Sequence, residues 1–422
     1  MFRQSRIDGK RFDAYTSNGS LEISSEKLHM SMQSEFSIQS EYFVTPNLFQ
    51  ADNPTLRDRL DSPNRVVAIV DSTVMKIYGE LIQKYFSYNQ IQFHSIEIQA
   101  VEAEKNFDTV VNILNFLGSK ELQVQRNESV LVIGGGMISD VAGFACSLQN
   151  RRTPYVMVPT TLVAAIDAGP SPRRGVNHAK FKNSFGSFHP PIMTLTDPTF
   201  FSSLSRAYVS EGLAEMIKVA IVADKDLFGK MESWGEHLTE DLLQFNSLAE
   251  QKKRQVEGLV LQATHAYMKN EVSNIFETHQ NRPHAYGHTW SPTFELAAGL
   301  RHGEAVSIGM ALGATLSLMD GQLLESDYLK ILKMLKTYCL PIFHSCLLDK
   351  ELMQRATDNI IAKRGIGCVH APAPSGIGEC VYLEEVDVNQ LLIAAEMLAS
   401  IEANLNSSSY SSSDLAPTPI QG

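Results

Sequence analysis

The sequence predicts an α/β domain built on a parallel sheet, followed by a helical domain. Between residues 66 and 159, short β-branched runs alternate with stretches whose apolar residues recur at helical spacing. That is the pattern of parallel strands joined by crossover helices. From about residue 211 the chain changes to long amphipathic segments with few strand candidates. A length of 422 residues, against about 150 for a typical domain, agrees with two domains.

The elements of the first half follow each other as strand, helix, strand. VVAIVD (66–71), VLVIGGG (130–136) and YVMVP (155–159) are β-branched runs that end in a polar residue, glycine or proline. NFDTVVNILNFLG and SDVAGFACSLQN, which lie between these runs, carry apolar residues every three or four positions and predict helices. Together they predict a sheet wound by helices.

The second half is expected to be helical, from segments such as EGLAEMIKVAIV, QVEGLVLQATHAYMKN and AVSIGMALGATLSLMDG. The boundary is expected near residues 190–205, after the proline-containing FHPPIM segment. Both ends of the chain are polar and rich in serine, so they lack the apolar surface that offsets chain entropy. The sequence therefore predicts a loosely ordered extension (1–40), an α/β domain (41–200), a helical domain (201–404) and a disordered tail (405–422).

Composition and charge exclude several classes of protein. With 36 Lys and Arg against 47 Asp and Glu, the formal net charge is −11, so a nucleic-acid partner is not expected. The five cysteines, odd in number and without CxxC spacing, indicate reduced thiols in a cytoplasmic protein. There is no apolar signal segment and no run of about 18 apolar residues, so neither secretion nor a membrane span is expected.

The segment VLVIGGGMISDVAGF is typical of a phosphate-binding turn. A strand, three glycines and a helix follow each other, and glycines let the backbone N–H groups and the helix N-terminus meet a pyrophosphate. The G-x-G-x-x-G pattern is incomplete, because Gly134 and Gly136 fit but Ser139 stands at the last position. A nucleotide site and a plain glycine turn both remain open.

Polar residues after two other strands are further candidates for a nucleotide site. Asp71 ends the 66–71 strand and is placed to bind a ribose hydroxyl, although a helix cap would need the same residue. Thr160 and Thr161 follow YVMVP and are placed to bind a cofactor, although threonines after proline are also typical helix caps.

Three polar positions in the helical half form a candidate metal site. Glu215 and Lys218 lie three residues apart on one helix face, which is also the spacing of a surface ion pair. His288 and His302 are separated by fourteen residues, and each alone would be explained as a capped or core histidine. One glutamate with two histidines can hold a zinc-like ion and leave a coordination position open. This interpretation requires the chain to turn back between the histidines.

A basic segment, RRGVNHAKFKNSFGSF, follows the threonines. Arg173, Arg174, Lys180 and Lys182 lie close together in it, with Asn177 and Asn183 between or beside them. Such a run is commonly a solvated face. The interleaved glycines and asparagines make a phosphate-binding loop the competing interpretation.

Taken in order, these segments resemble the sugar phosphate cyclases of the dehydroquinate synthase superfamily. The resemblance runs from about residue 66 to 383 and rests on EAEK (102–105), GGGMISDVAGF, VPTT, VNHAKFKNSFGSF, GLAEMIK, GHTW and HGEAVSIGM. It implies a Rossmann-like NAD-binding α/β domain, an all-α C-terminal domain and an active site in the cleft between them. It also implies NAD and a divalent metal, zinc or cobalt, as cofactors, a sugar phosphate as substrate, and a homodimer.

The resemblance also assigns roles to individual residues. The implied metal ligands are Glu215, His288 and His302. The implied cofactor residues are Asp71, Glu102, Lys105, Gly135, Gly136, Asp140, Thr160, Thr161 and Lys182. The implied catalytic residues are Asp167, Lys182, Lys218 and Glu271. The implied substrate or phosphate ligands are Arg152, Arg173, Asn183 and Arg282.

Within this superfamily the segment AYGHTWSP is similar to the branch that cyclises sedoheptulose 7-phosphate. Ala285 stands where members that make 2-epi-5-epi-valiolone tend to carry an acidic residue, and it favours desmethyl-4-deoxygadusol as the product. The segment DAGPSPRRGVN departs from the family, because it contains two prolines and has Arg173 in place of a lysine. Arginine still binds phosphate but does not readily release a proton.

The residues alone leave several other functions open. They are a 2-epi-5-epi-valiolone synthase, a 3-dehydroquinate synthase-like cyclase, a metal-dependent NAD(P) alcohol dehydrogenase and a non-catalytic relative. The basic segment weighs against the dehydrogenase, and the candidate metal ligands weigh against the non-catalytic relative.

Overall fold

The structure, a computed structural model, describes residues 15–24, 29–60, 64–179 and 181–406. They divide into two compact units: unit 1 holds the residues up to Thr160 together with Ala168–Pro198, and unit 2 holds Thr161–Asp167 and the residues from Thr199 on. The sequence assigns residues 161–167 to the α/β domain. They belong to unit 2 because Leu162, Ala165 and Ile166 are part of its hydrophobic core.

Unit 1 is built on a six-stranded parallel sheet with the strand order β3-β10-β7-β6-β4-β5. The strands are β3 (Glu41–Val44), β4 (Arg65–Asp71), β5 (Gln92–Ile98), β6 (Val130–Gly134), β7 (Tyr155–Pro159) and β10 (Met193–Thr196). β6 and β7 are buried along their whole length. A strand covered on both faces reads as a continuous apolar run rather than an alternating one, and this confirms the predicted parallel sheet.

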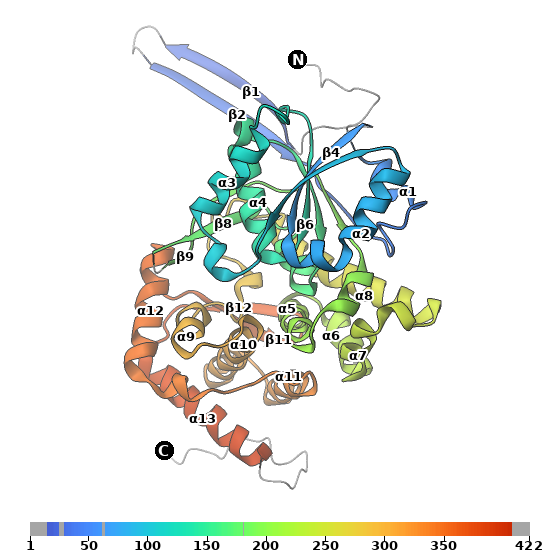
Figure 1. The fold of residues 1–422 in the computed structure, drawn as a ribbon. Coiled ribbons are helices and arrows are strands. Elements are labelled where there is room, and N and C mark those ends of the chain that lie inside the picture. Colours follow the sequence, from blue (N-terminus) through green and yellow to red (C-terminus); the bar gives the residue numbers. More distant parts are fainter. Residues whose placement is uncertain (1–14, 25–28, 61–63, 180, 407–422) are drawn as a thin grey trace, which may run out of the picture. The chain divides into compact units, whose positions relative to one another are not determined.

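Helices cover both faces of this sheet (Figure 1). They are α2 (Ser72–Tyr88), α3 (Phe107–Leu117) and α4 (Gly136–Leu148), with a short α1 (Pro54–Arg57) before β4. α3 and α4 pack against each other, and α4 also covers β4, β6 and β7. α2 packs against β4 and β5.

The chain changes its direction across the sheet at β4. β5 adds to one side of β4, and β6 then adds to the other side, so β4 and β6 are neighbours although they are not consecutive. Val70 is paired with Ile133, which places Asp71 beside Gly134 at the carboxyl ends of these strands. Ligands of open α/β sheets bind at such a switch point.

The strand of the sheet that comes first in the sequence pairs with the strand that comes last. β3 pairs in parallel with β10, from Glu41 beside Met193 to Val44 beside Thr196. The carboxylate of Asp197, just after β10, accepts hydrogen bonds from the backbone N–H groups of Asn47 at 3.1 Å and Leu48 at 2.7 Å.

Two antiparallel ribbons accompany the sheet. β8 (Arg173–His178) and β9 (Phe181–Phe188) form one of them, and β8 packs on α4. β1 (Tyr15–Ser24) and β2 (His29–Ile38) form the other, within the segment that composition predicts to be loosely ordered. The apolar residues of HMSMQSEFSI lie at alternate positions, interrupted only by Ser34, and this is a strand pattern that the polar composition conceals. The remainder of the predicted extension up to residue 14 lies outside the described residues, as does the predicted tail from residue 407.

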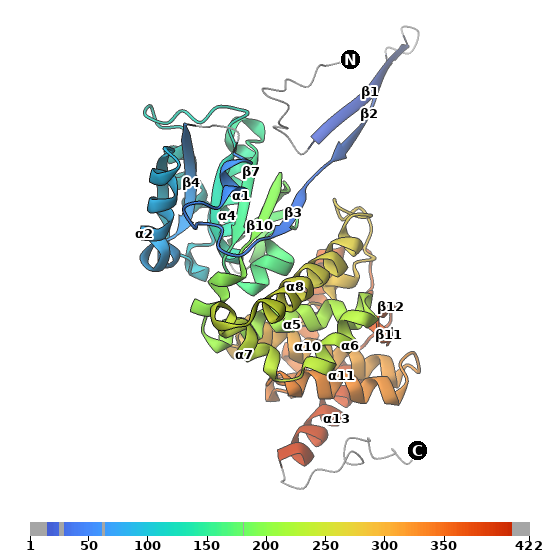
Figure 2. The same ribbon diagram turned by 90° about the vertical axis from the view of Figure 1, so that its right-hand side faces the viewer.

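Unit 2 is helical, as predicted, with the addition of one two-stranded antiparallel sheet. Its longer helices are α5 (Arg206–Ala223), α6 (Lys225–Trp234), α7 (His237–Leu243), α8 (Glu250–Glu271), α9 (Ser291–Ala298), α10 (His302–Met319), α11 (Glu325–Thr337), α12 (Lys350–Arg364) and α13 (Val388–Asn406). The sheet consists of β11 (Ala371–Gly376) and β12 (Glu379–Leu383). α5 packs on both α8 and α10 (Figure 2).

α10 is the central helix of unit 2. It contacts α5, α9, α11, α13 and β11, and most of its residues are buried. Its small residues allow this close packing on every side. None of the helices that the structure describes is long and apolar enough to cross a membrane.

Candidate active site

The three predicted metal ligands come together in unit 2. Glu215 lies on α5, His288 lies between η6 (Pro283–Ala285) and α9, and His302 is the first residue of α10. Glu215 Oε1 is 3.5 Å from His288 Nε2 and 3.2 Å from His302 Nε2. One ligand atom from each residue can be chosen so that all three lie within 4.8 Å of one another. The chain therefore turns back between the two histidines, as this site requires.

Glycines allow the three segments to approach this closely. A Cβ atom on Gly303, beside His302, would lie 2.6 Å from the Cα atom of Glu211 on α5. A Cβ atom on Gly309 would lie 2.1 Å from the carbonyl oxygen of Gly287, which itself has a φ of +77°. Real Cβ contacts are never this short, so the His288 loop, α5 and α10 can pack together only with glycine at these positions.

The second ring nitrogen of each histidine fixes which nitrogen faces the site. His288 Nδ1 is 3.1 Å from the carbonyl oxygen of Tyr286, which can only accept a hydrogen bond. His302 Nδ1 is 3.3 Å from Glu295 Oε2. In both rings Nδ1 is thus the donor, and Nε2 is the nitrogen that faces Glu215 and would bind a metal.

The charges of the ligand set are coupled. Burial alone would raise the pKa of Glu215, but Lys218 and the two histidines hold it well below its usual range. Burial, with Lys218, lowers the pKa of His288 to about 4. Burial also acts to lower the pKa of His302, but the hydrogen bonds to Glu215 and Glu295 outweigh it and raise that pKa to about 10. The three residues together therefore bind a proton, and a metal ion would displace this proton when it binds.

The donor set fits a catalytic divalent ion. Two imidazole nitrogens and one carboxylate are ligands that zinc prefers, at about 2.0–2.2 Å from the ion, and three protein ligands leave one position open. Two ligand atoms of one such ion lie roughly 3–4 Å apart, and the distances from Glu215 Oε1 to the two histidines fall within this range.

Lys218 forms a buried ion pair rather than a surface one. Its side chain and that of Glu215 are each 1% exposed, and Lys218 Nζ contacts Glu215 Oε2. Lys218 Nζ is also 3.3 Å from Asp167 Oδ2. Asp167 belongs to η3 (Ala164–Ala168), a single π-helical turn, a feature that is frequent at functional sites. The alternative of a solvated i,i+3 pair is wrong for this helix.

Glu271 lies in a second buried polar group of unit 2. Tyr267 Oη donates a hydrogen bond to Glu271 Oε1 at 3.3 Å, and His284 Nε2 lies 3.8 Å from the same oxygen. Lys218 Nζ lies 5.5 Å from the centre of the Tyr267 ring. Tyr267 thus connects Glu271 with the residues of the candidate metal site.

We predict that Glu295→Gln weakens metal binding about 10–100-fold, because carboxylates that orient a histidine ligand have effects of this size. Glutamine keeps a hydrogen-bond acceptor but loses the charge that supports His302. Competition with a chelator of known affinity measures the change. Glu396→Gln, at an exposed position of α13, is the matched control. Equal affinities of the Glu295→Gln variant and the wild type would contradict the assigned role.

Unit 1 gathers the candidate nucleotide residues at the carboxyl edge of its sheet. Gly135 is the N-cap of α4 and has no side chain to cap the helix, so the first N–H groups remain available to an anion. Asp71 stands beside this turn, and its carboxylate accepts a hydrogen bond from Thr73 N at 2.8 Å. Burial raises the pKa of Asp71. Thr160 N donates to the Gly134 carbonyl at 3.0 Å. Asp71 is thus a helix cap at the place expected for a ribose.

A polar cluster beside this edge contains more of the predicted residues. Lys105 Nζ lies 2.5 Å from Asp140 Oδ2, and the Lys105 carbonyl accepts from Asn177 N. Asn177 Nδ2 donates to Glu102 Oε1 at 2.8 Å, and Lys182 Nζ lies 3.7 Å from the same oxygen. Asn177 also accepts from the backbone N–H of Asn183. The β8–β9 ribbon is tied in this way to η1 (Glu102–Glu104) and α4.

Other predicted residues are not part of these groups. Thr161 belongs to unit 2, and its hydroxyl accepts from Ala164 N at 3.2 Å, as the helix-cap alternative requires. Arg152 has the unusual φ of +140° beyond the end of α4. Arg282 pairs with Glu277 at 2.6 Å. Arg173 begins β8 and is half-buried. Lys180 lies outside the described residues.

One expectation from the basic segment is wrong. Arg174 is 3% exposed and binds backbone carbonyls and Tyr155, so it is not a solvent-facing phosphate ligand. One residue with a role was missed, Glu295. Glu295 could have been found as the single acid in a short apolar helix seven residues after His288. Asn177, which the sequence offers as part of a phosphate-binding loop, contacts Glu102, Lys105 and Asn183 instead.

Comparison with known families gives these sites a context. The 3-dehydroquinate synthase N-terminal family model matches residues 95–211, and the 3-dehydroquinate synthase C-terminal family model matches residues 212–359. The chain belongs to the dehydroquinate synthase family of sugar phosphate cyclases. The two family models meet at residue 211, so Glu215 and both histidines lie in the part that resembles the C-terminal domain.

Individual members of the family cover most of the chain. The 2-epi-5-epi-valiolone synthase of Streptomyces hygroscopicus subsp. jinggangensis is 35% identical over 86% of this chain and 88% of its own. The demethyl-4-deoxygadusol synthase of Trichormus variabilis is 34% identical over 85% of this chain and 87% of its own. The solved structure of the Streptomyces enzyme ValA, with NAD+ and Zn2+ bound, matches with a TM-score of 0.79 over 86% of this chain and 98% of that one. The chain is thus a sugar phosphate cyclase that lies close to both kinds of enzyme.

Proposed function

We propose that this protein cyclises sedoheptulose 7-phosphate with loss of phosphate, using NAD+ and a divalent metal, and that its product is desmethyl-4-deoxygadusol. The observation that carries this proposal is the convergence of Glu215, His288 and His302 beside the buried Lys218. Relatives that are 34–35% identical and named for the two products of this branch support it.

The two cofactors are assigned to different parts of the chain. The metal would be held by Glu215 and both histidines, and it would supply Lewis-acid polarisation of a substrate oxygen. NAD+ would be held by the turn at Gly135 and Gly136, with Asp71 at the ribose, and it would supply a hydride acceptor that is restored in each cycle. The polar groups Glu102, Lys105, Asp140, Thr160, Thr161 and Lys182 are proposed to line the cofactor.

Lys218 would act on charge that develops in the substrate. Its ammonium group is held by Glu215 and Asp167, so it is fixed in place and stays charged inside a buried site. A preorganised positive charge stabilises the anionic character that forms when a proton is taken from carbon. Asp167, Lys182 and Glu271 are proposed as the other catalytic residues.

A cationic group in unit 2 supports binding of an anionic substrate. Arg282 Nε and Arg364 Nε are buried without a hydrogen-bond partner in the described part of the chain. Burial and the proximity of Arg282 lower the pKa of Lys363, and they lower that of Arg364 to about 10. Two arginines with unused donors, near Lys363, are a suitable place for a phosphate. Arg152, Arg173 and Asn183 of unit 1 are proposed as further phosphate ligands.

The choice of product rests on Ala285. It ends η6, and its carbonyl accepts a hydrogen bond from the backbone N–H of His288 at 2.9 Å. Its methyl group neither accepts a hydrogen bond from a substrate hydroxyl nor takes a proton. Without an acid or base at this point, we expect an intermediate to lose water and become an enolone. The sequence identities to the two kinds of enzyme are too similar to favour either product.

The experiment is incubation of the protein with sedoheptulose 7-phosphate, catalytic NAD+ and Zn2+, followed by mass spectrometry and NMR of the product. We expect many turnovers per NAD+, phosphate release and an ultraviolet-absorbing enolone. A saturated cyclitol ketone as sole product would assign 2-epi-5-epi-valiolone instead. Accumulation of NADH in proportion to product would show an alcohol dehydrogenase.

A further inference from the structure

Arg174 is a buried cation in unit 1 whose partners are all neutral. Its side chain donates from Nε to Tyr155 Oη at 2.7 Å, from Nη1 to the Ala168 carbonyl, and from Nη2 to the carbonyls of Gly169 (2.9 Å) and Ser171. Within the described residues it has no carboxylate partner. A buried guanidinium is tolerated only when its donors are satisfied, so these hydrogen bonds hold the turn at residues 168–171 in one conformation.

The same turn is fastened to the start of α4. The Ala168 carbonyl that accepts from Arg174 also lies 3.3 Å from Ser139 Oγ, whose single hydrogen is shared between this carbonyl and the Gly136 carbonyl at 2.8 Å. A Cβ atom on Gly136 would lie 3.5 Å from the Cβ atom of Ala168, in van der Waals contact. The position of the turn at residues 168–171 is therefore coupled to that of the glycine turn.

Two further contacts hold Arg174 itself. Tyr155 Oη, which accepts from Arg174, donates to the His189 carbonyl at 2.9 Å. Gly143 on α4 leaves the space that the side chain occupies, because a Cβ atom there would lie 2.4 Å from Arg174 Cδ. Any larger residue at position 143 must displace the arginine.

We propose that Arg174 is a positioning residue that holds the glycine turn of Gly134–Gly136 in the conformation that binds the cofactor. It acts through the carbonyl of Ala168 and through Ser139, and it does not contact the cofactor itself. This inference deepens the proposed NAD+ site and rests on it. The neighbouring Arg173, on the opposite side of β8, keeps its separate proposed role at the phosphate.

NAD+ binding to the full chain, measured by calorimetry, tests the proposal together with hydrogen exchange of the backbone amides. We expect Arg174→Met to weaken NAD+ binding about tenfold, because binding must then order the turn, and to raise exchange locally at residues 136–143 and 168–172. Metal content should stay unchanged. Arg174→Lys should resemble Arg174→Met, because an ammonium group cannot reach four separate acceptors. Restoration of affinity by lysine would show direct charge attraction and overturn the proposal.

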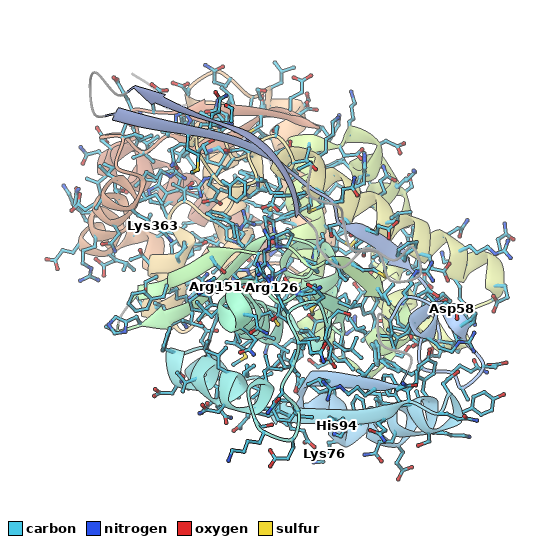
Figure 3. The ribbon with its side chains drawn as sticks, turned by 90° about the horizontal axis from the view of Figure 1, so that it is seen from above. Asp58, Lys76, His94, Arg126, Arg151 and Lys363 are labelled. Atoms are coloured by element: carbon cyan, nitrogen blue, oxygen red, sulfur yellow. The ribbon has the colours of Figure 1, made fainter. Side chains whose placement is uncertain are left out.

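Three other variants sharpen the test. Gly143→Ala should weaken NAD+ as Arg174→Met does, and the two changes combined should not add, since both remove the same arrangement. Arg126→Met, at an exposed position of unit 1 labelled in Figure 3, is the control and should bind NAD+ normally. Should Arg174→Met fail to fold, Ser139→Ala carries the test, because it removes the hydroxyl that lies between the Ala168 and Gly136 carbonyls and leaves Arg174 and its own hydrogen bonds in place.

The outcomes separate this inference from the proposed function. A wild-type chain that binds NAD+ but makes no cyclic product would disprove the proposed function and leave the role of Arg174 intact. Unchanged NAD+ affinity in Arg174→Met and Ser139→Ala, or exchange that rises throughout unit 1 rather than locally, would overturn the role of Arg174. A wild-type chain without NAD+ affinity would overturn both.

Discussion

The His302→Ala variant is expected to lose its divalent metal and its turnover together. His302 Nε2 faces Glu215 Oε1, and the ring is held in this orientation by Glu295. Removing a residue that merely supports a ligand costs about 10–100-fold in metal affinity or activity, so loss of the ligand itself should exceed about 100-fold. Elemental analysis after gel filtration from excess zinc measures the metal, and phosphate release measures turnover.

The exposed His265 on α8 supplies the matched control. His265→Ala removes the same atoms from the same unit, far from the ligand set in sequence, and should keep full metal and full activity. A His302→Ala protein that is folded and fully loaded with metal would remove His302 from the site. Far-ultraviolet circular dichroism of both variants verifies that they are folded.

The Lys218→Met variant is expected to keep its metal and lose turnover by about 10²–10⁴-fold. This is the range found when a positioned acid, base or electrostatic group is removed from a reaction centre. Methionine has a similar length but no charge, so Glu215 and Asp167 lose the cation that lies between them. The metal ligands themselves are unchanged. Initial rates with saturating Zn2+ and NAD+ measure the loss.

Lys230 provides the comparison for Lys218. It pairs with Asp226 at 2.7 Å on α6, but its side chain is 53% exposed. Lys230→Met breaks an ion pair of similar length in water, where such pairs contribute about 0–1 kcal/mol, and should leave turnover unchanged. Equal rates for Lys218→Met and wild type would show that the buried pair serves the fold alone. Equal losses in both lysine variants would point to a general effect of charge.

Much of the fold was predictable because the physical pattern is local. The strands at 66–71, 130–134 and 155–159 are short, buried and β-branched, and the first two are each followed by a helix that packs on the sheet. The β11–β12 sheet was not predicted. β11 reads APAPSG, and prolines normally argue against a strand. They are tolerated in a two-stranded sheet, because each strand is an edge that leaves some N–H positions unpaired.

The candidate metal site could be predicted by residue type, but the burial and direction of its neighbours could not. EGLAEMIKVAIV has only three charged residues, Glu211, Glu215 and Lys218, and so few charges are typical of a largely buried helix, so burial of the pair at 215 and 218 could have been expected. Positions 173 and 174 are adjacent and both are arginine, so residue type does not distinguish them. Successive strand residues point to opposite faces, and only the packing of β8 on α4 decides which arginine is enclosed.

The pairing of the edge strand β3 determines when the sheet of unit 1 can be completed during synthesis. β3 leaves the ribosome about 150 residues before its partner β10 and the capping Asp197. At about 5–20 residues per second, this interval is roughly 10–30 s. The growing chain carries β3 unpaired throughout that time, and the outer edge of β7 stays unpaired from its own synthesis until β10 follows, because β10 joins both. Completion of the nascent sheet therefore depends on a single four-residue strand that emerges last.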